Sequence, residues 1–92
     1  MTAYLVRVEL FGAGPNDYEN LHESMKSKGF SREVSYETGE IQKLPIGTYV
    51  GYSLLSAVGV RDEVMAISSP FSTKTASIFV CDYNNWAAHL YN

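Results

Sequence analysis

The sequence predicts an α+β fold built around an antiparallel sheet, and three observations support this prediction. Four segments alternate apolar and polar residues with the period of a strand, two segments have the period of a helix, and together they occur in the order βαββαβ. The chain has 92 residues and is 46% hydrophobic, so we expect one folded domain over residues 1–92. A short C-terminal segment, residues 84–92, is expected to pack back on that domain.

The first strand and the first helix have the clearest patterns. Residues 3–11 alternate, with apolar side chains on one face and Arg7 and Glu9 on the other. After a glycine-rich turn, Asn16 and Glu19 have the spacing of a capping box at the start of a helix, and Gly29 is a typical terminator. The apolar stripe of this helix is expected to consist of Tyr18, Leu21, His22 and Met25.

The second and third strands are expected over residues 30–37 and 41–52, joined by a turn at Thr38-Gly39. Pro45 has no backbone N–H, so we expect an edge position or a bulge near it. The buried side of the returning strand is expected to consist of Leu44, Ile46 and Val50.

The second helix is expected within residues 53–68 and the last strand within residues 75–83. In the C-terminal segment, Trp86 and Leu90 are spaced for one helical turn. Two helices on one face of a four-stranded antiparallel sheet form the ferredoxin-like arrangement. The open face of that sheet is expected to carry Tyr36, Tyr49, Tyr52 and Tyr83.

Charge and cysteine content exclude several classes of protein. The net charge is −3 and the pI is near 5.2, so overall charge does not attract the protein to nucleic acid or to anionic membranes. The single cysteine, Cys81, excludes a disulfide within the chain and a cysteine-based zinc site. We expect no metal and no cofactor. No segment has the length of a membrane span and no signal peptide is recognisable, so we expect a cytoplasmic protein.

The candidate binding residues lie where the first helix ends. Lys26, Lys28 and Arg32 form the one local cluster of positive charge in the sequence, with Glu33 as the nearby acid and Tyr36 on the adjoining strand. Such a cluster suits a phosphate backbone or an acidic protein surface, with the tyrosine as an interface anchor. The alternative is that the lysines only complement the helix dipole. No catalytic residue is expected in this interpretation.

The other reactive side chains have structural explanations. The helical carboxylates lie at helix starts and on outer faces. His22 and His89 are not spaced to share a ligand, so we expect packing or surface roles for both. Cys81 lies in the middle of a strand, without the cationic surroundings that activate a nucleophilic thiol.

Three segments resemble the GhoS family of antitoxins: Tyr4–Leu10, Asp17–His22 and Gly29–Arg32. The resemblance spans most of the chain. It implies a ferredoxin-like fold related to the small nuclease subunit of CRISPR adaptation, and an endoribonuclease that destroys a toxin's mRNA.

One departure bears on that activity. The adaptation nuclease subunit carries an acidic metal ligand at the end of its first strand, where this chain has Leu10-Phe11-Gly12. A metal-dependent nuclease is therefore poorly supported. Metal-free RNA cleavage stays open, with Arg7, His22 and Arg32 as its candidates.

The whole chain also resembles phage-encoded anti-CRISPR proteins of type I-F, in size and general character. This resemblance implies a stoichiometric inhibitor without catalytic activity. It would bind the multisubunit Cas protein–crRNA surveillance complex in the host bacterial cell and stop target DNA from pairing with the guide. Lys26, Lys28 and Arg32 would contact crRNA phosphates or an acidic subunit surface. We take this inhibitor as the primary expectation and the GhoS-type endoribonuclease as the alternative; either is compatible with a homodimer.

Overall fold

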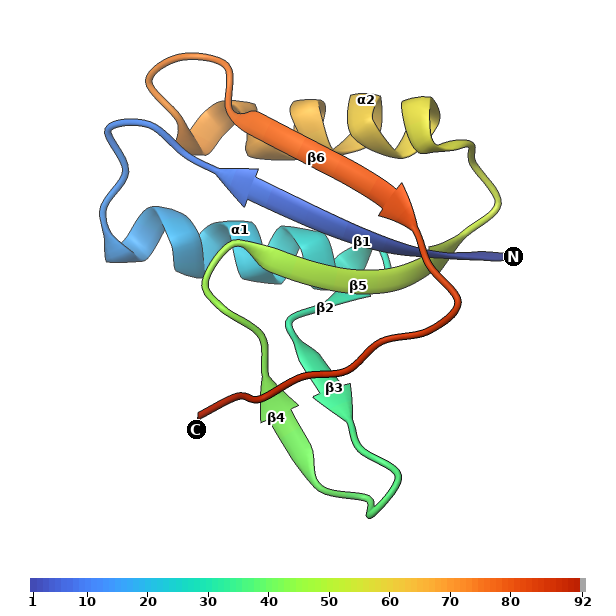
Figure 1. Ribbon diagram of the computed structural model, residues 1–92. Coiled ribbons are helices and arrows are strands. Elements are labelled where there is room, and N and C mark those ends of the chain that lie inside the picture. Colours follow the sequence, from blue (N-terminus) through green and yellow to red (C-terminus); the bar gives the residue numbers. More distant parts are fainter. Residues whose placement is uncertain (92) are drawn as a thin grey trace.

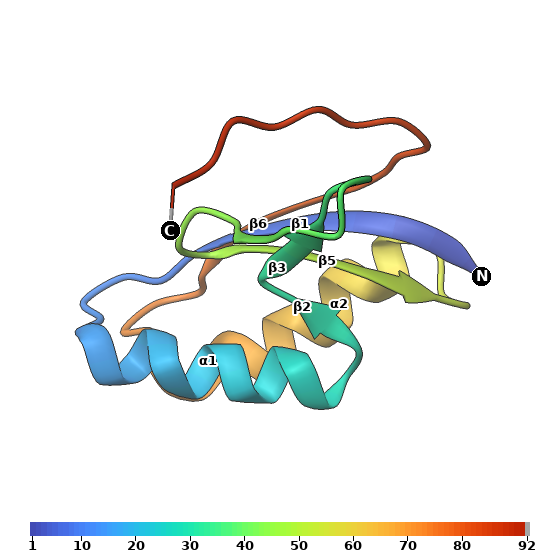
Figure 2. The same cartoon turned by 90° about the horizontal axis from the view of Figure 1, so that it is seen from below.

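The computed structural model describes residues 1–91, and it has the α+β architecture that the sequence predicts. A four-stranded antiparallel sheet, in the order β2-β5-β1-β6, carries both helices on one face (Figures 1 and 2). A separate two-stranded sheet pairs β3 with β4. The elements are β1 Thr2–Glu9, α1 Pro15–Ser27, β2 Phe30–Ser31, β3 Glu33–Ser35, β4 Ile41–Lys43, β5 Thr48–Ser53, α2 Ala57–Ser68, the 3-10 helix η1 Ser69–Phe71 and β6 Ser77–Asp82.

The core lies between the sheet and the two helices. The alternation of β1 buries Tyr4, Val6 and Val8 against the helices, while Arg7 and Glu9 face the other side of the sheet. The helices close the core with the apolar stripes that their spacing predicts, because residues three and four apart share one face of a helix. The helix residues that are fully buried in it are Leu21, Met25, Val60 and Val64.

Helix α1 begins two residues earlier than the capping pattern predicts. Gly14 is the N-cap residue, Pro15 is the first helical residue, and the Gly14 N–H donates to Asp17 Oδ2 at 2.9 Å. Pro suits this first position because its fixed φ is helical and its missing N–H would have no helical partner. The predicted cap formed by Asn16 and Glu19 was therefore wrong, although the end of the helix before Gly29 was right.

The predicted second and third strands are each broken in two. The first divides at Arg32 into β2 and β3, and the second divides between Lys43 and Thr48 into β4 and β5. Gly47 has a φ of 83°, and a β-carbon there would overlap the carbonyl oxygen of Val8. The chain thus turns away sharply near Pro45 instead of forming a bulge, and the β3–β4 hairpin leaves the main sheet (Figure 1).

This break changes which side chains face the core. Ile46 lies in the turn and is 61% exposed, so its predicted burial was wrong, while Leu44 and Val50 are half-buried. Tyr49 pairs with Val6 and shares its face, so the Tyr49 side chain is fully buried beneath the helices rather than on the open face. Tyr52 is on the open face and exposed.

The C-terminal tail, defined here as residues 83–91, has no helix or strand and runs across the β3–β4 hairpin (Figure 1), on the side of the sheet away from the helices (Figure 2). The predicted helical turn at Trp86 and Leu90 is absent from the described residues; position 92 lies outside them. The Trp86 ring instead packs against Tyr36 of the hairpin side, with ring centroids 6.0 Å apart. A small apolar cavity of about 170 Å³ lies beneath the tail, with Cys81 in its wall.

With the β3–β4 hairpin set aside, the order of the elements is compatible with a ferredoxin-like fold. Within residues 1–91, no helix has the length and apolar character that crossing a bilayer requires.

Candidate functional site: a cation-lined groove beside α1

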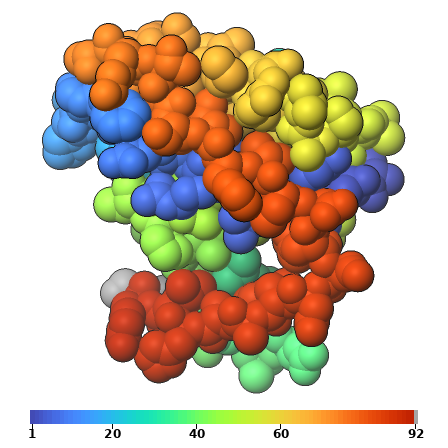
Figure 3. All heavy atoms as spheres, turned by 45° about the horizontal axis from the view of Figure 1, so that its top comes forward, coloured from blue at the N-terminus to red at the C-terminus, as the bar shows by residue number. Residues whose placement is uncertain are grey.

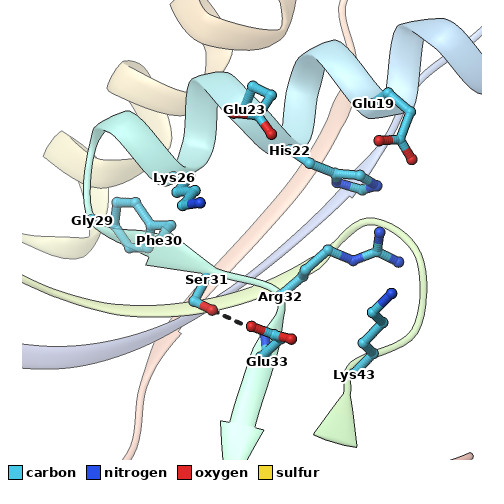
Figure 4. A pocket seen from close by; sticks show the side chains of 10 residues that line it. All are labelled: Glu19, His22, Glu23, Lys26, Gly29, Phe30, Ser31, Arg32, Glu33 and Lys43. Atoms are coloured by element: carbon cyan, nitrogen blue, oxygen red, sulfur yellow. Dashed lines mark hydrogen bonds between the residues drawn. The ribbon is translucent and has the colours of Figure 1, made fainter. Parts of the chain in front are cut away.

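A groove lies where the second half of α1, strand β2 and the base of the β3–β4 hairpin meet (Figure 4). Its volume is about 450 Å³. The residues that line it are Glu19, His22, Glu23, Lys26, Gly29, Phe30, Ser31, Arg32, Glu33 and Lys43. Three cations and three carboxylates are therefore present, and their arrangement rather than their sum decides what the groove attracts.

Helical spacing and the strand break bring these side chains together. His22 and Lys26 are four residues apart on α1 and so lie on one face of the helix. Arg32 occupies the break between β2 and β3, and its side chain extends into the groove toward His22 (Figure 4). Lys43 ends β4 directly opposite Glu33 in the hairpin register.

The structure places three of the five predicted site residues in this groove. Lys26, Arg32 and Glu33 line it, whereas Lys28 and Tyr36 do not. Lys28 is the exposed C-cap residue of α1, where its charge faces the helix end. Tyr36 lies further along the hairpin and contacts Trp86 of the tail.

The His22 side chain contacts the hydrophobic core on the side away from the groove. Its Nδ1 contacts the hydroxyl of the buried Tyr49. Burial lowers the pKa of His22 below its ordinary value of 6.5, and the nearby charge of Arg32 lowers the pKa further, so the ring is neutral at pH 7. Burial also raises the pKa of Tyr49, so its phenol keeps its proton at pH 7. When that hydroxyl donates to Nδ1, the imidazole proton is on Nε2 and the free edge of His22 is a hydrogen-bond donor; when Nδ1 carries the proton, the free edge is an acceptor.

Arg32 and Lys43 face the same space. In Figure 4 the Lys43 ammonium points toward the Arg32 guanidinium, below the His22 ring. Neither forms an ion pair within residues 1–91, where Arg61 with Asp62 is the one pair closer than 4 Å. The Arg32 Nε is buried and has no hydrogen-bond partner in the described chain. Two cations therefore face a space in which no carboxylate of residues 1–91 neutralises them at contact distance.

A second concavity of about 570 Å³ continues from the first, toward the start of α1. His22, Arg32 and Glu19 line both, so they form the shared wall. Arg7 reaches the second concavity from β1, and its Nη1 donates to the carbonyl oxygen of Val8 at 2.7 Å. The three candidates for metal-free RNA cleavage, Arg7, His22 and Arg32, are thus brought together in one cavity.

Lys43 and Tyr49 are the residues of this site that the analysis of the sequence missed. A signal for Lys43 was present, because a hairpin turning at Thr38-Gly39 puts Lys43 opposite Glu33. No comparable signal exists for Tyr49, because its orientation depends on the chain break before β5.

Among residues 1–91, no three His, Cys, Asp or Glu side chains converge as a set that could hold a metal ion. The chain is therefore a small α+β protein with a groove beside α1 that is lined by three cations and three carboxylates. No protein-family model matches the chain, and no curated protein matches it either.

Proposed function

We propose that this chain is a non-catalytic inhibitor with a ferredoxin-like fold, an anti-CRISPR that binds the type I-F crRNA-guided surveillance complex and blocks pairing of target DNA with the guide. The groove beside α1 takes a phosphate group of the crRNA backbone. The resemblance of the whole chain to type I-F anti-CRISPR proteins supports the identity of the complex, and the groove supports the mode of contact.

The observation that carries the binding mode is the pair Arg32 and Lys43. Both cations face one space without an ion-pair partner in the described chain. A phosphate oxygen accepts charge-assisted hydrogen bonds from a guanidinium and an ammonium, which are about twice as strong as neutral ones. In the tautomer that carries its proton on Nε2, His22 is a third donor to the same anion.

The surrounding acids favour a ribonucleoprotein over free RNA as the target. Glu19, Glu23 and Glu33 line the same groove, and the whole chain has a net charge of −3. A long free RNA meets repulsion along most of this surface, while a single phosphate set among protein subunits does not. The groove thus contributes one anchored contact within a larger protein interface.

The tautomer of His22 decides between binding and catalysis. With its proton on Nε2 and the Tyr49 hydroxyl donating to Nδ1, the neutral ring donates to an anion and has no free lone pair for a ribose hydroxyl; with its proton on Nδ1, the Nε2 lone pair is free to act as a general base. The inhibitor proposal takes the first tautomer.

The experiment is a pull-down of the purified protein with a reconstituted type I-F surveillance complex, followed by target-DNA binding by that complex. The wild-type chain is expected to co-purify and to abolish DNA binding. Lys43→Glu is expected to weaken both effects strongly, because it reverses an exposed groove cation without touching the core. Lys28→Glu is the matched control, because it changes the same charge outside the groove. Equal loss in both variants, or no association of the wild type, contradicts the proposal.

A second candidate function is the GhoS-type endoribonuclease, and one observation favours it. Arg7, His22 and Arg32, the three candidates for metal-free RNA cleavage, line one cavity, where they could supply acid–base and electrostatic groups. This function predicts cleavage of RNA by the purified protein with no partner and with a chelator present, and loss of cleavage in Arg7→Gln or His22→Gln. Intact RNA after prolonged incubation with the wild type excludes it.

A further inference from the structure

Strand β6 forms an open edge of the main sheet. Its one strand partner within residues 1–91 is β1, and it runs over Ser77–Asp82. Figure 3 shows this strand on the surface, bordered by α2. The opposite edge differs, because β2 has only two residues and then leaves the sheet at Arg32. The long edge therefore carries most of the exposed backbone of the sheet.

The register identifies which backbone groups of β6 lack a strand partner. The Tyr83 N–H donates to the Ala3 carbonyl oxygen, and the pairing continues through Leu5 with Cys81 and Arg7 with Phe79. Because hydrogen-bonding direction alternates along an antiparallel strand, these odd-numbered residues of β6 face β1. The N–H and C=O groups of the even-numbered residues, Ile78, Val80 and Asp82, point outward.

This edge lacks the features that usually prevent pairing with another strand. Proteins protect exposed edges with proline, lysine, a bulge or a very short strand. Ser77–Asp82 contains neither Pro nor Lys, and its register with β1 is continuous over all six residues. Its one charge, Asp82, is at the end of the strand.

Phe79 is an exposed aromatic residue in the middle of this edge. Its side chain is 64% exposed on the face of the sheet away from the helices, beside the half-buried Cys81. An aromatic ring at the centre of an unprotected strand is a typical anchor for an interface.

We propose that β6 pairs with β6 of a second copy of this chain, antiparallel about a two-fold axis at Phe79. The outward groups of Ile78 in each copy then bond those of Val80 in the other, and Phe79 lies opposite Phe79. An antiparallel pair of identical strands is self-complementary, so one two-fold axis satisfies both edges and closes the assembly as a dimer. The result is one continuous eight-stranded sheet.

The apolar pattern favours this register over the one with its axis at Val80. Shifting the axis to Val80 puts Ile78 opposite Asp82, which opposes an apolar side chain and a carboxylate. The axis at Phe79 pairs Ile78 with Val80 and stacks aromatic on aromatic. Facing residues at a non-hydrogen-bonded position have Cα atoms about 4.5 Å apart, close enough for a disulfide.

The test uses single cysteines in a Cys81→Ser background. Phe79→Cys/Cys81→Ser is expected to form a covalent dimer under mild oxidation. Ser77→Cys/Cys81→Ser is the matched control, because residue 77 lies opposite residue 81 and roughly 13 Å along the strand from its own counterpart. Light scattering of the wild type is expected to give the mass of a dimer. A monomeric wild type at high micromolar concentration, or equal cross-linking of both variants, overturns the proposal.

A second variant separates dimer loss from misfolding. Phe79→Lys is expected to give a folded monomer, because the side chain is exposed and a lysine there is a typical edge protection. Tyr52→Lys is the control on the same open face but away from the edge, and it is expected to stay dimeric. A dimeric Phe79→Lys contradicts the proposal.

Discussion

The hydroxyl of Tyr49 contacts Nδ1 of His22, and this contact joins the buried centre of β5 to the wall of the groove beside α1. The two rings lie 5.6 Å apart between centroids. Because the tyrosine is fully buried, its position is set by the core, and the histidine side chain is oriented by it in turn. The groove is thus supported by the same packing that stabilises the fold.

Removing that hydroxyl should affect both stability and the histidine. Tyr49→Phe is expected to lower the free energy of unfolding by about 1 kcal/mol, because His22 Nδ1 loses its hydrogen-bond partner while the ring still fills the core. Urea unfolding measures the stability, and nitrogen chemical shifts of the imidazole report a loss of the Nε2–H tautomer. Tyr52→Phe, at an exposed tyrosine, is expected to change neither.

The stability of the fold should decrease in mild acid because of His22. Its folded pKa lies below 6.5, so the unfolded chain binds the proton more readily than the folded one. The stability contributed by the neutral ring is therefore fully present above pH 6.5 and is lost as pH falls through the folded pKa. Urea unfolding at a series of pH values should show this decrease, and His22→Gln should reduce it. An unchanged slope in that variant contradicts the assignment.

The turn before β5 should be sensitive to the size of one residue. Gly47→Ala is expected to destabilise the protein strongly, because Gly47 has φ 83° and a β-carbon there meets the Val8 carbonyl oxygen. Gly39→Ala is the matched control: its φ is 87° but the space around it is empty, so only the backbone cost of about 1 kcal/mol applies. The difference between the two, measured by thermal unfolding, isolates the steric contribution, which we expect to be about 1–3 kcal/mol.

The C-terminal tail should shield the thiol of Cys81. Cys81 is half-buried and lines the small cavity beneath the tail. The tail residues that cover this cavity include Trp86, Ala87 and Ala88. Replacing Trp86 with Ala should therefore raise the rate at which a thiol reagent labels Cys81, by several-fold at neutral pH. Leu54→Ala, at an exposed residue that does not line this cavity, is expected to leave the rate unchanged. Equal rates in all three proteins would show that the tail does not cover the thiol.

Regular periodicity in the sequence correctly predicted the elements whose pattern no turn interrupts. The alternation over β1 and the helical stripe ending at Met25 both match the buried faces. The prediction failed where a turn changes the parity of a strand. The break between Lys43 and Thr48 moves Ile46 to the surface and turns Tyr49 into the core, and period-2 reasoning cannot detect such a shift.

The candidate site was predictable only in part for a related reason. Lys26 and Arg32 are close in sequence, and their convergence follows from the helix end. The contributions of Lys43 and His22 depend on the hairpin leaving the main sheet and on a contact through the core. Conversely, Lys28 is closer to Arg32 in sequence than Lys26 is, but it lies outside the groove, because it follows the last helical turn.

Contact of Arg32 and Lys43 with phosphate is tested most directly by the salt dependence of binding. The affinity for the crRNA-loaded surveillance complex would be measured over a range of salt concentrations for the wild type, Lys43→Gln and Arg32→Gln/Lys43→Gln, with Lys28→Gln as control. Each phosphate contact on single-stranded RNA contributes about 0.7 to the slope of log affinity against log salt. We predict that the slope decreases by about that amount for each groove cation removed and is unchanged in Lys28→Gln. An identical slope in all four proteins would contradict the claim.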